Sequence, residues 1–164
     1  MQDYKELTLE ELYEIGYETG ERILDANASE LPVIGTPGTH AEDAEDWRDE
    51  VKNMAHDAEE NMRCFSPFEF FAKDLNDRDD PDEAWDSYDE GVAEGISHAV
   101  DELRPRVSES YAIERTREML DEVHEPVKIG DLEYDAGYVL QEVDPVAFWQ
   151  EVLAWADSEG LDID

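Results

Sequence analysis

Residues 80–105, DPDEAWDSYDEGVAEGISHAVDELRP, constrain the fold of this chain more than any other stretch. Pro81 suits the first position of a helix, and Pro105 ends it. Apolar residues recur at steps of three and four, which places them on one helix face: Trp85, Tyr88, Val92, Ile96, Ala99 and Leu103. The opposite face carries carboxylates: Asp82, Asp86, Glu90, Glu94 and Asp101. The stretch therefore predicts an amphipathic helix with one face in a core and a row of negative charges on the other.

Such a row is energetically unfavourable. Like charges four residues apart destabilise a helix, and no Lys or Arg occupies the intervening positions of the row. Carboxylates ~6 Å apart repel by roughly 0.7 kcal/mol per pair in water before salt screens them. Over a few dozen pairs this repulsion is comparable with the ~5–15 kcal/mol that stabilises a domain. The rows therefore call for a functional explanation.

Further helices are predicted at about 8–25, 39–63, 66–76, 108–124 and 145–158, from capping residues, prolines and apolar spacing. Three of them repeat the acidic row: Glu10, Glu14 and Glu18; Asp46, Asp49 and Asp57; Glu114 and Glu118. Residues 127–134 alternate around Gly130-Asp131, which predicts a small β-hairpin. The predicted fold is mainly α, a compact bundle of five to six amphipathic helices in a single acidic domain spanning residues 1–164.

Two triplets share one spacing in separate helices: Tyr13, Gly16, Gly20 and Tyr88, Gly91, Gly95. Each glycine costs up to ~1 kcal/mol inside a helix, so a packing purpose is favoured. The interpretation preferred here is that the two glycine faces pack on each other; an internal duplication is the alternative.

The charge balance limits the possible partners. The chain has 47 acidic and 12 basic residues, a net charge of −35 and a pI of 4.1. This field repels nucleic acid and anionic membranes and attracts basic surfaces. With 40% hydrophobic residues the chain can still form a core. The single Cys64 suits a reducing compartment, and MQDYKELTLEEL lacks a signal-peptide pattern, so a soluble cytoplasmic protein is expected.

Catalysis and metal binding have little support. The four histidines are scattered, and no phosphate-binding loop or nucleophile elbow is present, so neither an enzyme nor a cofactor is expected. Asp131, Glu133, Asp135 and Glu142 occupy positions 1, 3, 5 and 12 of an EF-hand loop, but Ala136 stands where that loop needs glycine. An acidic rim on the hairpin explains the same residues. No metal site is predicted, and calcium binding is left open.

The last predicted helix is apolar on more than one face. Phe148, Trp149, Val152 and Trp155 are candidates for a dimer interface, because two apolar faces exceed what a terminal helix normally buries. The sequence therefore predicts a homodimer through residues 145–156, with the acidic rows turned outward.

The acidic rows suggest a function. Ordered negative charge can imitate a phosphate backbone and occupy a surface that binds DNA through Lys and Arg. The thirteen carboxylates of the four rows are therefore predicted to bind a basic, DNA-binding host protein, without direct contact to nucleic acid. The alternatives are an acidic protein of a high-salt habitat and an interaction module that does not imitate DNA.

Three segments resemble small uncharacterised open reading frames of phages and prophages: SPFEFFAKDLN, DPDEAWDSYDEGVAEG and EYDAGYVLQEVDPVAFW. In composition the chain is also similar to Ocr-type anti-restriction DNA mimics, although no motif matches residue by residue. These resemblances imply a phage origin and an inhibitor of a restriction, CRISPR, glycosylase or other defence enzyme.

Overall fold

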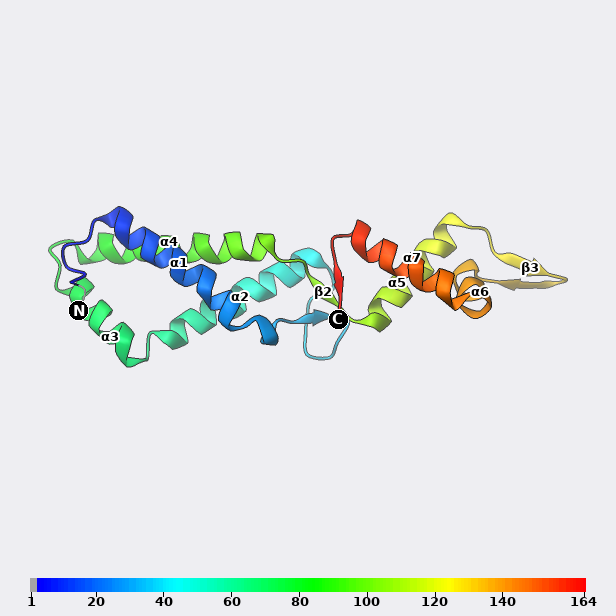
Figure 1. The fold of residues 1–164 in the computed structure, drawn as a ribbon, viewed down its shortest axis with the longest axis horizontal. Helices are drawn as coiled ribbons and strands as arrows, with labels where there is room; N and C mark the ends of the chain where they lie inside the picture. The colour runs from blue at the N-terminus through cyan, green and yellow to red at the C-terminus, as the bar shows by residue number, and fades with distance from the viewer. Residues whose placement is uncertain (1–2) are drawn as a thin grey trace. The chain divides into compact units, whose positions relative to one another are not determined.

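A computed structural model describes residues 3–164 and is mainly helical, with 68% of residues in helices. Its described part contains seven α-helices, so the expected count of five to six is wrong by at least one. The chain divides into two compact units (Figure 1). Unit 1 comprises the described residues up to Leu31 together with Arg48–Leu103, and unit 2 comprises Pro32–Trp47 and Arg104–Asp164. The prediction of a single domain stays a prediction.

Unit 1 is built on helices. These are α1 (Leu9–Ala26), followed by a short 3-10 turn (Ala28–Glu30), most of α2 (Ala44–Met62), α3 (Ser66–Asn76) and α4 (Pro81–Glu102). A capping box starts α1: the Thr8 hydroxyl accepts from the Glu11 amide at 3.1 Å, and the Glu11 carboxylate accepts from the Thr8 amide at 2.8 Å.

The start predicted for α2 near residue 39 is wrong. The Thr39 hydroxyl accepts a hydrogen bond from the Ala41 amide at 3.0 Å and so belongs to a turn. The Asp43 carboxylate accepts from the Asp46 amide at 2.8 Å, and the helix begins at Ala44. Asp43 thus satisfies one of the first free amides of α2.

The glycines of α1 and α4 pack on each other, as the shared spacing predicted. The two helices run side by side in the same direction (Figure 1). A Cβ added at Gly16 would lie 2.2 Å from the carbonyl oxygen of Tyr88, and one at Gly91 would lie 2.1 Å from that of Tyr13. The backbones are therefore in direct contact, which only glycine permits. Tyr88 and its apolar neighbours on α4 are buried, and the carboxylate face of α4 is exposed.

Unit 2 combines a small parallel sheet with three helices and a hairpin. Strands β1 (Val33–Ile34), β2 (Arg106–Val107) and β5 (Asp162–Ile163) form a parallel sheet in the order β1-β2-β5, which the sequence did not predict. The helices are α5 (Glu109–Val123), α6 (Ala136–Val143) and α7 (Pro145–Ser158). Strands β3 (Val127–Ile129) and β4 (Leu132–Tyr134) pair antiparallel, so the predicted hairpin is confirmed.

Helix α6 was not predicted, and it is held closely against α5. The Gly137 amide donates to the Asp121 carboxylate at 2.9 Å, and a Cβ at Gly137 would lie 2.9 Å from the Cα of Arg117. The Arg117 guanidinium donates to the side-chain oxygen of Gln141 on α6. Val123, the last residue of α5, is 68% exposed although it is apolar. No helix within residues 3–164 combines the length and apolarity needed to cross a bilayer.

Candidate interaction surfaces

The thirteen carboxylates proposed as a DNA-like surface are all exposed. Ten belong to unit 1: Glu10, Glu14 and Glu18 on α1, Asp49 and Asp57 on α2, and Asp82, Asp86, Glu90, Glu94 and Asp101 on α4. Three belong to unit 2: Asp46, Glu114 and Glu118. The structure thus brings the α1 and α4 rows onto one pair of helices, and we refer to these eight carboxylates as the α1–α4 rows.

The contact between α1 and α4 draws their polar side chains together. The Tyr13 hydroxyl on α1 donates a hydrogen bond to the Glu94 carboxylate on α4. The Ser87 hydroxyl on α4 donates to the carbonyl of Leu9 on α1 at 2.5 Å. These bonds join the exposed edges of the two helices and hold the rows in a defined relation.

Two tyrosines report the negative potential of this surface. The hydrogen bond to Glu94 raises the pKa of Tyr13 to about 12, and partial desolvation and the charges of Glu94 and Glu90 add to the effect. Desolvation, followed by the charges of Glu21, Glu102 and Glu94, raises the pKa of Tyr17. Both phenols are thus harder to ionise, Tyr13 chiefly because of its hydrogen bond to Glu94 and Tyr17 chiefly because of desolvation, with nearby carboxylates adding to both effects.

His98 lies between two carboxylates at the same helix pair. Its Nδ1 is 3.2 Å from Glu21 on α1, and its Nε2 is 3.4 Å from Glu102 on α4. Sequence reasoning did not assign His98 or Glu102 to the site. The spacing of Glu94, His98 and Glu102 by four residues was the available signal, since it places them on one face.

Few cations neutralise the α1–α4 rows. Glu18 pairs with Arg22 across 3.5 Å, and both side chains are well exposed. Among the described residues, no ion pair reaches Asp82, Asp86 or Glu90. Most of the negative charge is therefore available to an external partner.

Arg63, another cation of unit 1, is used internally. It bonds to the buried Glu59 at 2.7 Å and to Asp89 at 2.6 Å. Its guanidinium also lies 5.5 Å from the ring centroids of Phe68 and Trp85. Burial lowers the pKa of Arg63, but the two carboxylates outweigh it and raise that pKa overall. This cluster stabilises the unit and leaves Arg63 unable to compensate the rows.

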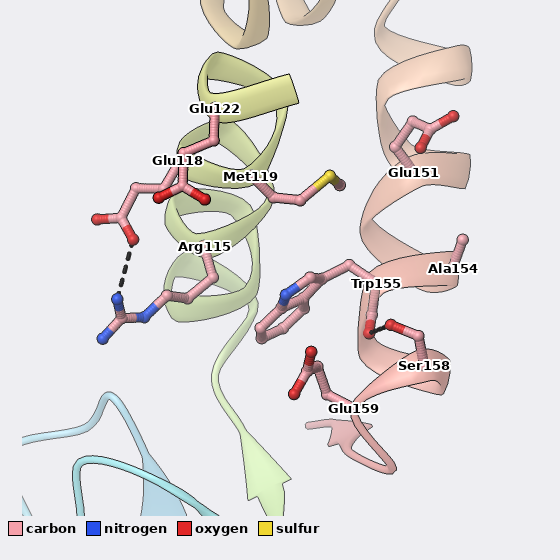
Figure 2. A pocket seen from close by; sticks show the side chains of 9 residues that line it. All are labelled: Arg115, Glu118, Met119, Glu122, Glu151, Ala154, Trp155, Ser158 and Glu159. Atoms are coloured by element: carbon pink, nitrogen blue, oxygen red, sulfur yellow. Dashed lines mark hydrogen bonds and ion pairs between the residues drawn. The ribbon is translucent and has the colours of Figure 1, made fainter. Parts of the chain in front are cut away.

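Unit 2 carries a groove between α5 and α7, with a volume of about 480 Å³ (Figure 2). The Trp155 indole and the Met119 side chain point into the space between the two helices. The groove is bordered by Glu118, Glu122, Glu151 and Glu159. Arg115 is the cation at its edge, and it is already paired with Glu118 at 2.9 Å. The groove thus offers an aromatic ring among carboxylates.

A second hollow of about 490 Å³ lies between α6, the end of α5 and β3, and it is mainly apolar. Leu120, Val127, Val139, Leu140 and Val143 line it, with Val143 78% exposed. Glu125 and Glu151 stand at its border, so Glu151 is shared with the first groove.

The candidate dimer residues divide between two environments within unit 2. Phe148 and Val152 are buried against their own unit, at 3% and 0% exposed. Trp149 and Trp155 are half-buried. The homodimer stays a prediction, and only the tryptophans of this set retain surface for a partner.

The calcium-like pattern is not assembled as a loop. Asp131 lies in the turn of the hairpin, Glu133 lies in β4, and Glu142 lies near the end of α6. Within residues 3–164, no group of three or more acidic, His or Cys side chains is placed to hold a metal ion.

No family model, curated protein or solved structure matches this chain. The resemblance to phage proteins stays a prediction.

Proposed function

We propose that this protein is a DNA-mimic inhibitor that binds the DNA-binding surface of a basic host protein, such as a restriction, CRISPR or glycosylase enzyme. The observation that carries the proposal is the pair of exposed carboxylate rows on α1 and α4, held together by direct backbone contact at glycines. It requires no cofactor and no direct contact with nucleic acid.

The charge density of the α1–α4 rows supports the proposal. Carboxylates four residues apart are spaced by ~6 Å along a helix. Where Glu10–Glu18 of α1 runs beside the evenly spaced part of the α4 row, Asp82–Glu94, the two rows together supply one negative charge per ~3 Å of helix axis. A strand of B-DNA carries one phosphate per ~3.4 Å. A protein surface that pairs Lys and Arg with successive phosphates of one strand therefore meets a similar linear density of charge.

The rigidity of the helix pair is a second supporting argument. Backbone contact at Gly16, Gly20, Gly91 and Gly95 leaves little freedom for the helices to separate. The electrostatic repulsion between the rows is thus already present in the folded protein before a partner binds. A preorganised surface loses less conformational entropy on binding than flexible acidic tails would. A partner's cations would also relieve that repulsion.

Competition with DNA tests the proposal. A purified restriction enzyme, a DNA glycosylase and an RNA-guided nuclease are each loaded with a fluorescent duplex of about three helical turns. We expect this protein to displace the duplex from at least one of them, with an apparent Kd that weakens steeply with salt. Simultaneous binding of the protein and the duplex would instead favour an interaction module that does not imitate DNA.

A matched pair of variants localises the effect. The row variant carries Asp86→Asn, Glu90→Gln and Glu94→Gln on α4. We expect it to displace DNA about tenfold less well, because three exposed charge contacts are lost. The control variant removes three exposed charges of unit 2, through Glu109→Gln, Asp131→Asn and Glu142→Gln. Equal weakening by both variants would assign the effect to net charge rather than to the α1–α4 rows.

The net charge of −35 also suits adaptation to high salt, which is the second candidate. The two explanations differ at low ionic strength. A DNA mimic has to be folded near 0.1 M salt, about where cells operate, whereas a halophilic protein loses structure there. Far-UV circular dichroism between about 0.1 and 2 M salt distinguishes them: a constant helical signal argues against the halophile, and loss of helix at low salt argues against the mimic.

A further inference from the structure

We propose that unit 2 carries a second binding surface, which receives an amphipathic basic helix of a partner protein. The surface consists of the apolar hollow lined by α5, α6 and β3 and the adjoining groove at Trp155 (Figure 2). This inference does not depend on DNA mimicry, because its binding energy comes from apolar contact as well as charge.

The apolar hollow indicates that one face of the partner helix is apolar. Val127, Val139, Leu140 and Val143 are only partly buried or exposed, and they converge from β3 and α6 on one hollow. Its volume of about 490 Å³ accommodates several aliphatic side chains from one face of a helix. Water in contact with these side chains would be released when such a face binds.

The carboxylates at the border indicate that basic residues flank this apolar face of the partner helix. Glu122, Glu125 and Glu151 make no ion pair and no side-chain hydrogen bond within the described residues. Arg115 is occupied by Glu118 and also lies over the Tyr111 ring at 5.1 Å from its centroid. Apart from Arg115 and His124, no basic side chain in the described part of the chain lines the two hollows, and Lys or Arg flanking the apolar face of a partner helix would pair with the carboxylates at the border.

Trp155 adds a specific contact for one such cation. Its indole points into the groove with Glu159 beside it, and Glu118 and Glu151 also line the groove. A guanidinium or ammonium group over the ring would gain a cation–π interaction and carboxylate partners at the same time. A second copy of this chain fits the surface poorly, since it would bring further carboxylates to a border that is already negative.

The probe for the test is a synthetic helix of leucine and lysine, with the leucines on one face. Its binding to the isotope-labelled full chain is followed by amide chemical shifts at about 0.3 M salt, where long-range attraction is largely screened. We expect shifts confined to α5, β3, α6 and the Trp155 side of α7. Shifts confined to α1 and α4 would overturn the proposal. A leucine–glutamate helix of the same pattern should not bind; equal binding by it would also overturn the proposal.

Variants with matched controls complete the test. Val143→Ser and Glu151→Gln should each weaken the Kd of the leucine–lysine helix about fivefold. Val146→Ser and Glu109→Gln change exposed residues of the same types outside both hollows, and they should leave the Kd within about twofold. If the control variants weaken the Kd as much as Val143→Ser and Glu151→Gln do, the proposed surface is not the binding site of the leucine–lysine helix.

The two proposals fail in distinguishable ways. The row variant on α4 should keep its affinity for the leucine–lysine helix while it loses competition with DNA. Conversely, Val143→Ser should still displace DNA from a target that contacts only the α1–α4 rows. Loss of both activities in both variants would mean that the two surfaces are not separate and would overturn the inference.

Discussion

Gly91→Ala should destabilise the protein, although alanine is the better helix former. On propensity alone the change would add up to ~1 kcal/mol to the free energy of unfolding. The new Cβ, however, would lie 2.1 Å from the carbonyl oxygen of Tyr13 and 3.0 Å from the amide nitrogen of Tyr17. Both are backbone atoms of α1, so no side chain can rotate away.

The size of the effect follows from this geometry. A carbon–oxygen contact is comfortable at about 3.3 Å, so α1 has to move by roughly 1 Å. Overpacking of this kind costs ~1–3 kcal/mol or more, and the displaced helix also loses close contact along its length. After subtraction of the propensity gain, we expect a net loss of about 2 kcal/mol. Gly95→Ala should lower the free energy of unfolding less in the Gly91→Ala background than in the unaltered protein, because Gly91→Ala has already moved the two helices apart.

Urea unfolding followed by far-UV circular dichroism measures this effect. With a slope of ~2 kcal/mol per M, the midpoint of Gly91→Ala should fall by about 1 M. Two controls bracket the result. Ala93→Gly, at an exposed position of the same helix, should cost only the propensity difference of ~1 kcal/mol. Gly38→Ala, where an added Cβ meets nothing within 4 Å, should change stability by less than about 0.5 kcal/mol. A midpoint for Gly91→Ala at or above that of the unaltered protein would refute the backbone-contact argument.

Three further predictions concern charge. The row variant should melt at a higher temperature than the unaltered protein at about 0.05 M salt, by ~1 kcal/mol of relieved repulsion, and the gain should disappear near 1 M. The pKa of Tyr13 is about 12 in the folded protein against 10.0 ordinarily, so the protonated phenol contributes to the free energy of unfolding in full below pH 10, and this contribution is lost as the pH rises towards 12. In alkaline unfolding curves, Tyr13→Phe should therefore lose less stability between pH 10 and pH 12 than the unaltered protein. Arg63→Met should cost ~3–5 kcal/mol, because it leaves Glu59 buried without its cation, and adding Glu59→Gln should recover part of this loss in a double-mutant cycle.

The helices of unit 1 could be predicted because their determinants are local. Thr8 and Glu11 make the capping box that their spacing indicates, and Pro81 opens α4 as expected. The glycine triplets even indicated which helices meet, since interior glycines need a compensating close approach. Asp80, which precedes Pro81, is of a type that commonly caps helices, but it accepts no capping hydrogen bond and pairs with Arg78 at 2.9 Å.

The parallel sheet of unit 2 could not be predicted, because its strands are two residues long. Two residues show no alternation, and their partners are distant in sequence: the Ser108 amide donates to the Ile34 carbonyl at 2.8 Å. Helix α6 was missed for a related reason. Its eight residues are too few to show a helical period, and its position depends on contact with Arg117 and Asp121.

The candidate surfaces were predictable to different degrees. Exposure of the carboxylate rows follows from helical spacing alone, and every predicted member is exposed. The place of His98 between Glu21 and Glu102 depends on the register of α1 against α4, which spacing within one helix does not reveal. The apolar hollow of unit 2 could not be predicted, because it is formed in part by α6, which the sequence did not indicate.

The order in which the strands of unit 2 occur has a consequence for synthesis. β1 lies near residue 33, β2 near 106 and β5 near 162, so the first strand leaves the ribosome long before its neighbours exist. At ~5–20 residues per second, β1 waits on the order of ten seconds for the sheet to be completed. Each unit is also encoded by separated pieces of the gene, because the chain leaves unit 1 after Leu31 and returns at Arg48. No contiguous fragment of the gene therefore encodes one unit alone, and loss of residues 162–163 would remove a strand from a sheet that began with residue 33.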